Sequence, residues 1–164
     1  HFHIALTQEL GLPNFRKFGG NTAFAEGWAL YAETLGKEMG LFDKPEDYFG
    51  HLNDEMLRAA RLVVDTGMHT KGWSRDQSIT YFRETLGYSE LEARAQIERY
   101  MVMPGQALAY KIGSLKIMEL RQRAQAALGD KFSLPKFHEV VLDEGTLPLA
   151  VLEAKVDRWI AASK

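Results

Sequence analysis

Capping motifs and glycines divide this sequence into segments of helical periodicity, and that division leaves few alternatives for the fold. Asp43–Glu46, Ser74–Gln77 and Ser89–Glu92 each have the form of a capping box, a short polar or acidic residue followed three positions later by Glu or Gln. Between these motifs, apolar residues recur at the three- and four-residue intervals of an amphipathic helix. No stretch alternates apolar and polar residues as a half-buried strand does. The pattern predicts an all-α fold.

The boundaries follow from the same signals. We expect a single domain over residues 1–164, made of about seven or eight helices, because no linker is long enough to divide it. Residues 15–20, which include Gly19 and Gly20, are predicted to form a loop. The predicted helices cover approximately residues 1–10, 23–40, 43–67, 75–86, 90–102, 104–128, 133–144 and 146–160.

Composition excludes several classes of function. The net charge of −2 offers no electrostatic footprint for nucleic acid or an anionic membrane. The absence of Cys rules out thiolate metal sites, a cysteine nucleophile and disulfides. No apolar run approaches the roughly 20 residues of a transmembrane helix. The sequence opens without Met, in the middle of a helical pattern, so we expect it to be a fragment of a longer protein.

Glu26 is the first candidate for a functional side chain. It lies on a predicted helix whose core stripe includes Phe24 and Tyr31, and its own neighbours on the opposite side are also apolar. A carboxylate on an apolar wall needs a cation, a metal or a hydrogen-bond network, because burying it unpaired is costly. An ordinary ion pair with Arg58 or Arg61 explains Glu26 equally well.

A second polar group lies on the long helix predicted to begin near residue 43. Arg58, Arg61 and Asp65 share one stripe that continues toward His69, and Arg61 and Asp65 have the spacing of an i, i+4 ion pair. Spacing alone favours a solvated charged face. The change from apolar to polar to apolar residues around Asp65 and His69 instead suits the wall of a cleft.

A third group follows Pro104. Gln106, Tyr110 and Gly113 recur at i, i+4 and i+7, so an amide and a phenol share a face with little bulk. A tyrosine in this position can donate a hydrogen bond to a developing oxyanion. It is as often a core tyrosine with a satisfied hydroxyl. His1 and His3, at the start, point about 200° apart on a helix and do not form a same-face pair of ligands.

Four segments of the chain carry a resemblance to a known family, and they are residues 26–33 (EGWALYAE), 61–69 (RLVVDTGMH), 71–73 (KGW) and 104–113 (PGQALAYKIG). Taken together, these segments resemble the bacterial domain-of-unknown-function 885 family over essentially the whole chain. Members of that family are largely helical and similar to zinc metallopeptidases of the gluzincin kind. Many are predicted secreted lipoproteins, which implies a periplasmic or secreted location.

The resemblance also implies roles for individual residues. His1 matches the last His of a His-Glu-x-x-Pro-Gly-His-His segment, whose first His and general-base Glu would lie upstream. Glu26 matches the downstream carboxylate ligand of zinc. His69 and Tyr110 are expected to stabilise the oxyanion. The remaining candidates would orient a ligand or bind substrate, and they are Arg61, Asp65 and Gln106.

These expectations define a specific hypothesis. The chain is predicted to be the C-terminal part of a zinc-dependent metallohydrolase, within a larger gluzincin-like fold, that acts on a peptide or a small molecule. It would supply Glu26 and the cleft wall and would be inactive without the upstream part of the same protein. We further expect Glu26, Asp65, His69 and Tyr110 to converge on one cleft. The alternative is a non-catalytic helical domain with a binding or structural role.

Overall fold

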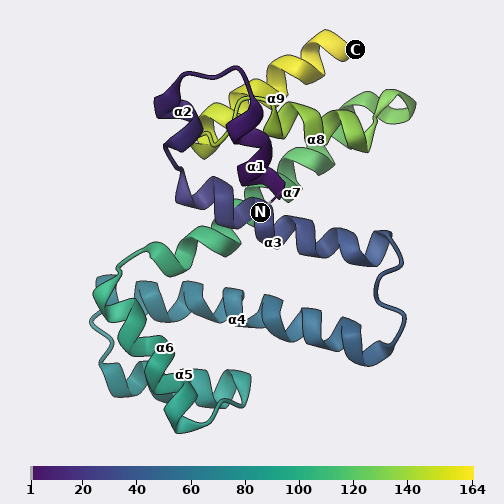
Figure 1. Ribbon diagram of the computed structural model, residues 1–164. Helices are drawn as coiled ribbons and strands as arrows, with labels where there is room; N and C mark the ends of the chain where they lie inside the picture. Colours follow the sequence, from purple (N-terminus) through teal and green to yellow (C-terminus); the bar gives the residue numbers. More distant parts are fainter. Residues whose placement is uncertain (1) are drawn as a thin grey trace. The chain divides into compact units, whose positions relative to one another are not determined.

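The structure is a computed structural model that describes residues 2–164, with side chains from residue 3 onward (Figure 1). Helices are its only regular elements, and the described residues include no strand, which confirms the all-α prediction. Residues 2–164 contain nine α-helices rather than seven or eight. The additional one is α2 (Asn14–Phe18), a single short turn of helix in the segment predicted to be a loop.

The chain forms two compact units. The first comprises residues 1–31 and 112–164, and the second comprises residues 32–111. Helices α3 (Thr22–Glu38) and α7 (Ala109–Leu128) each contribute residues to both units. That residues 1–164 form a single domain stays a prediction.

The first unit contains α1 (Phe2–Glu9), α2, the beginning of α3, most of α7, α8 (Leu134–Leu142) and α9 (Leu149–Ser163). Helix α8 packs against both α1 and α9. A short 3-10 turn at Gly129–Lys131 follows α7. The core of this unit consists of side chains that are almost completely buried, among them Phe24, Tyr31, Ile117, Leu120, Phe137, Val141, Leu152 and Val156.

The second unit is built on α4 (Pro45–Thr70), with α5 (Arg75–Leu86) and α6 (Glu90–Val102) packed on it and on each other (Figure 1). A 3-10 turn, η1 (Gln106–Leu108), also packs against α4. Its core draws one stripe of residues from each helix: Leu57, Ala60, Val64, Ile79, Phe82, Ala93, Ile97, Tyr100 and Ala107.

Capping decides where two of these helices begin. The side chains of Ser74 and Ser89 accept the backbone N–H of Gln77 and Glu92, and both reciprocal bonds of the capping box are present. The box predicted at Asp43 is wrong. Lys44 occupies the position before α4 and makes no side-chain cap, because Pro45 begins the helix one residue later than the box requires.

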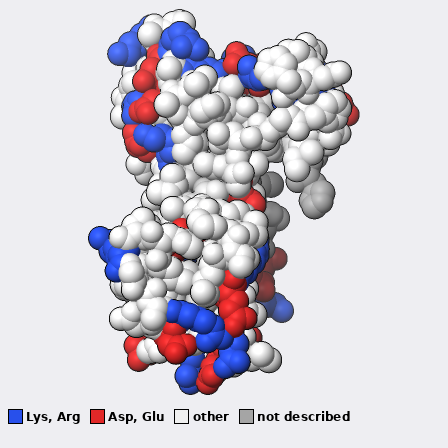
Figure 2. Space-filling view, turned by 90° about the vertical axis from the view of Figure 1, so that its left-hand side faces the viewer, with Lys and Arg blue, Asp and Glu red and all other residues white. Residues whose placement is uncertain are grey.

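The surface shows no strong preference for one sign of charge. On the face shown in Figure 2, Lys and Arg atoms are interspersed with those of Asp and Glu. One network joins the Arg123 guanidinium to Glu119, Glu153 and Asp157. Within residues 2–164, no helix combines the length and apolar character needed to cross a membrane.

Candidate functional site

Glu26 lies one turn into α3, and its side chain is half-buried. Helix α3 begins at Thr22 because the Asn21 side-chain oxygen accepts the Phe24 N–H at 3.0 Å, as an N-cap does. Among the described residues of its own unit, the Glu26 carboxylate has no hydrogen bond and no ion pair. It is therefore a partly desolvated oxygen donor that remains available for a ligand.

The helix that carries Glu26 approaches α7 at backbone contact. A Cβ atom built on Gly27 would lie 2.4 Å from the Cα atom of Gly113. One built on Gly113 would lie 1.8 Å from the carbonyl oxygen of Ala23. Both distances are far shorter than van der Waals contact, so the two glycines allow a crossing that no other residue permits. Glu26 is thus held next to a close contact between two helix backbones.

The other side of α3 is fixed by aromatic packing. The Tyr31 hydroxyl lies 2.8 Å from Nε2 of His138, and the Trp28 ring meets the His138 ring edge-on at 5.4 Å. Phe24 and Tyr31, two residues of the predicted core stripe, are fully buried, whereas Trp28 and Leu35 of the same stripe are only partly buried. Packing of this face leaves little freedom for the helix to rotate and change the direction of Glu26.

Asp65 is buried in the second unit, with 2% of its surface exposed. Its two carboxylate oxygens accept the Gly105 N–H, at 3.1 and 3.2 Å. Gly105 has a φ of +79°, in the left-handed region that favours glycine. Asp65 therefore ties the loop after α6 to α4. The ion pair predicted between Arg61 and Asp65 does not form in the described chain, because this backbone N–H takes its place.

His69 contacts the backbone of α6. Its Nε2 atom lies 3.0 Å from the carbonyl oxygen of Tyr100. A carbonyl only accepts hydrogen bonds, so Nε2 carries the proton and Nδ1 is the unprotonated nitrogen of the neutral ring. A neutral His69 therefore has no further N–H for an oxyanion, and only the imidazolium form could donate one from Nδ1.

Arg61 is held between two tyrosines. Its Nε–H donates to the Tyr100 hydroxyl at 2.7 Å, and that hydroxyl donates to the Gln96 side chain at 2.6 Å. The guanidinium lies 4.9 Å from the Tyr110 ring centre and 5.5 Å from that of Tyr100. Burial raises the pKa of the Tyr100 phenol, and the adjacent Arg61 charge opposes that rise.

Tyr100 is the residue that sequence reasoning missed. Its side chain holds Arg61 and its carbonyl holds His69, yet in sequence it is simply one more apolar position on α6. Gln106 and Tyr110, predicted to share one face, lie next to each other, and the Gln106 amide is 3.4 Å from the Tyr110 hydroxyl. In the second unit, Arg61 and Tyr110 thus come together, while Asp65 and His69 hold backbone groups.

The predicted site residues are divided between the two units. Glu26 belongs to the first unit, whereas Arg61, Asp65, His69 and Tyr110 belong to the second. Their convergence on one cleft stays a prediction. His1 lies outside the described residues. Across residues 2–164, no three His, Asp or Glu side chains are grouped so that they could hold a metal ion.

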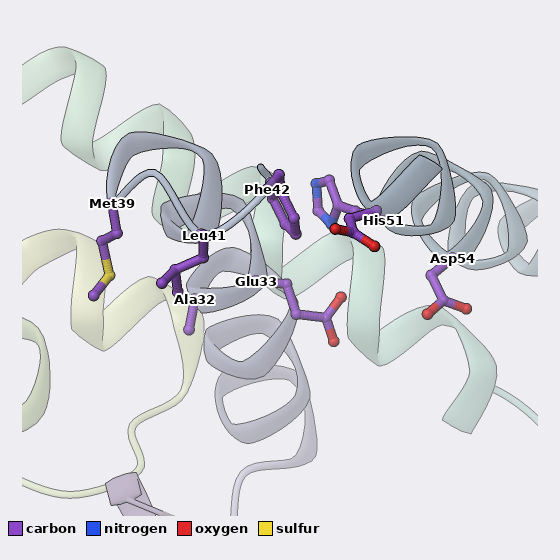
Figure 3. Close-up of a pocket in the computed structure, with 9 residues that line it drawn as sticks. Ala32, Glu33, Met39, Leu41, Phe42, His51 and Asp54 are labelled. Atoms are coloured by element: carbon purple, nitrogen blue, oxygen red, sulfur yellow. The ribbon is translucent and has the colours of Figure 1, made fainter. Parts of the chain in front are cut away.

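A pocket of about 390 Å³ lies in the second unit, where α3 turns into α4 (Figure 3). The Phe42 ring stacks on the His51 ring with centres 5.3 Å apart. Two acidic residues at its edge face Arg58, which contacts Asp54 at 2.9 Å and Glu33 at 4.0 Å. Arg58 thus pairs with two of the carboxylates that line the pocket, and none of the predicted site residues lines it.

A smaller pocket of about 270 Å³ lies in the first unit, with His3, Thr7 and Lys17 in its lining. His3 is 6% exposed, packs on the Phe24 ring, and has no hydrogen-bond partner at Nε2 among the described residues. Burial lowers the pKa of this imidazole, which favours the neutral ring. The sequence assigned no role to His3.

Comparison with known proteins identifies the family. The model of the family described as "Bacterial protein of unknown function (DUF885)" matches residues 1–156, and the chain belongs to this family. A search of curated proteins finds no match.

Two solved structures are similar to the chain. The crystal structure of a "putative lipoprotein" from Colwellia psychrerythraea is 48% identical, with a TM-score of 0.96 over 99% of this chain. A "putative lipoprotein of unknown function" from Shewanella oneidensis is 24% identical, with a TM-score of 0.86 over 94% of this chain, and shows the same fold. This chain spans 28% of the length of each of those proteins.

Proposed function

We propose that the chain is part of a zinc-dependent hydrolase that cleaves peptides, with Glu26 as a carboxylate ligand of the metal. The observation that carries this proposal is the half-buried Glu26 carboxylate, which has no partner among the described residues of its unit although the surrounding helix is tightly packed. A structural carboxylate in that position would be paired. A metal ligand would instead stay unpaired until the metal ion binds.

The described residues fit one part of a zinc site rather than a complete one. They offer the Glu26 carboxylate and no group of three ligands. A catalytic zinc uses three protein ligands and, when bound, supplies a water of lowered pKa and polarises a carbonyl. In this proposal His1 and residues of a longer protein provide the other ligands and the general base. The relatives, of which this chain spans 28%, have length for such residues.

Within the chain, Tyr110 is the best candidate for donating a hydrogen bond to an oxygen of the substrate. Its hydroxyl accepts the Gln106 amide N–H, so its own proton is free for that oxygen. His69 would share this role only as an imidazolium, because its neutral N–H is committed to Tyr100. Location follows the relatives: a periplasmic or secreted lipoprotein is proposed.

The test uses a longer protein that includes the residues preceding His1. We expect about one zinc per chain by elemental analysis, and peptide hydrolysis that a chelator abolishes. Glu26→Gln should weaken zinc binding by much more than the roughly 10–100-fold expected for the loss of an outer hydrogen-bond partner. Glu33→Gln is the matched control, because Glu33 lies on the same helix with an exposed side chain.

Two results would count against the proposal. Unchanged zinc affinity in Glu26→Gln would make the carboxylate structural, and absence of zinc from the longer protein would remove the metal altogether. The 164-residue chain alone should purify with little zinc and hydrolyse no peptide.

A second candidate function is a non-catalytic helical domain that binds a partner or supports the rest of the protein. The observation in its favour is that Asp65 and His69 both hold backbone groups. Zinc content separates the two candidates, since only the hydrolase requires the metal.

A further inference from the structure

Arg61 is a buried cation that lacks an anionic partner. Only 8% of its surface is exposed, and its one hydrogen bond within its unit is the bond from Nε to the Tyr100 hydroxyl. No acidic side chain forms an ion pair with Arg61 among the described residues of that unit. Stacking between Tyr100 and Tyr110 compensates for part of the desolvation. A buried charge ordinarily has a charged partner as well.

The acidic residues of the same helix are committed elsewhere. Asp54 pairs with Arg58, Glu55 pairs with Lys111, and Asp65 accepts the Gly105 N–H. Helix α4 therefore has carboxylates on both sides of Arg61 in sequence, but none of them pairs with the Arg61 guanidinium. The missing anion has to come from outside the unit.

The two terminal nitrogens of Arg61 are open to that anion. Neither makes a hydrogen bond within its unit. The bond from Nε and the two tyrosine rings fix the plane of the guanidinium. A fixed planar fork of N–H donors matches the two oxygens of a carboxylate.

The neighbouring side chain adds a further donor. The Tyr110 ring lies against the guanidinium, and its hydroxyl accepts the Gln106 amide, which leaves the phenol proton to donate. The charged fork and the phenol lie next to each other and form a site for an anion with planar oxygens. A metal cation would be repelled there by Arg61.

We propose that Arg61 and Tyr110 bind the carboxylate at the C-terminal end of a peptide substrate. The consequence of this contact for activity rests on the proposed function. In a peptidase, such a contact selects substrates with a free C-terminus and makes the enzyme an exopeptidase. The binding step itself requires neither zinc nor hydrolysis. An acidic side chain carries the same carboxylate chemistry, so the experiment has to separate the two sources.

The experiment is calorimetric titration of the 164-residue chain with three short peptides. The first is Ala-Ala-Phe with a free C-terminus, the second is its C-terminal amide, and the third is Ala-Glu-Ala amide. We expect the free acid to bind roughly 10–100-fold more tightly than its amide, the range typical of hydrogen bonds to charged groups. The Arg61 Nε–H resonance should shift with the free acid and stay unchanged with the amide.

Variants test the assignment to individual residues. Arg61→Met should remove the preference for the acid, and Arg61→Lys should restore only part of it because the planar fork is lost. Tyr110→Phe keeps the ring beneath the guanidinium and should weaken binding of the acid by a few-fold. Arg58→Met is the matched control, because Arg58 lies on the same helix and its guanidinium is already paired with Asp54. Circular dichroism establishes that each variant is folded.

The outcomes divide clearly. Equal affinity for acid and amide in the wild-type chain, or an unchanged preference in Arg61→Met, would overturn the proposal. Tighter binding of Ala-Glu-Ala amide than of the free acid would overturn the C-terminal assignment. If Arg61→Met does not fold, Tyr110→Phe and the Arg61 resonance still decide. The binding measurement involves no zinc and no hydrolysis. Failure of the zinc-peptidase proposal would therefore leave it unchanged, and failure of the carboxylate-binding proposal can be recognised separately.

Discussion

The contact between Gly27 and Gly113 offers the most direct test of how the Glu26 helix is positioned. Replacing either glycine by alanine adds one Cβ atom and changes nothing else. In Gly27→Ala that atom would lie 2.4 Å from Gly113 Cα and 2.8 Å from the Ser114 nitrogen. In Gly113→Ala it would lie 1.8 Å from the Ala23 carbonyl oxygen. All these neighbours are backbone atoms, which cannot rotate away as a side chain can.

Two opposing effects set the magnitude. Alanine is intrinsically better than glycine inside a helix by about 1 kcal/mol. Ordinary contact begins near 3.4 Å, so α3 and α7 would have to separate by about 1 Å for Gly27→Ala and about 1.6 Å for Gly113→Ala. Overpacking on this scale costs about 1–3 kcal/mol or more. We expect a net loss on the order of 1–2 kcal/mol for Gly27→Ala and a larger one for Gly113→Ala.

The assay is urea and thermal unfolding followed by circular dichroism at 222 nm, the standard wavelength for helix. Each kcal/mol should lower the Tm by about 2–4 °C for a chain of this size. Gly50→Ala is the matched control, since Gly50 lies inside α4 with no atom within 4 Å of the added Cβ. That variant should gain about 0.5–1 kcal/mol. If Gly27→Ala and Gly113→Ala are stabilised as Gly50→Ala is, the close helix contact does not exist.

Two further predictions concern the second unit. Asp65→Ala should reduce the free energy of unfolding by about 1–3 kcal/mol because the Gly105 N–H loses its acceptor. Asp65→Asn should reduce it by less. Equal urea midpoints for wild type and Asp65→Ala would contradict this prediction. The Ser89 hydroxyl and N–H lower the pKa of the Glu92 carboxyl, so its contribution to stability is present above the ordinary carboxyl pKa and is lost as the pH falls through the lowered one. The stability difference between wild type and Glu92→Gln should therefore shrink in acid, and a difference independent of pH would refute the bond.

The positions of most helices could be predicted from sequence because helical signals are local. The boxes at Ser74 and Ser89 operate over three residues, and the structure begins α5 and α6 directly after them. The same locality explains the errors. Asn14–Phe18 is too short for a periodic pattern, and at Asp43 the proline that follows moved the start of the helix.

The candidate site was predicted less completely, because a residue's chemistry depends on the partner that packing brings to it. Periodicity placed Arg61 and Asp65 four residues apart and so predicted an ion pair. In the structure each turns to a residue about forty positions further along, Tyr100 for Arg61 and Gly105 for Asp65. The family resemblance identified residue types suited to zinc chemistry, and it could not show which polar groups remain unpaired.

The sequence by itself determined that this chain is helical, where most of its helices begin and end, and which face of α3 is apolar. These properties depend on interactions between residues at most a few positions apart. Only the tertiary structure decided that Gly27 meets Gly113 at backbone contact and that the Arg61 guanidinium donates to the Tyr100 hydroxyl. Those contacts join residues 39 to 86 positions apart, and their geometry depends on how whole helices pack, which no local pattern encodes.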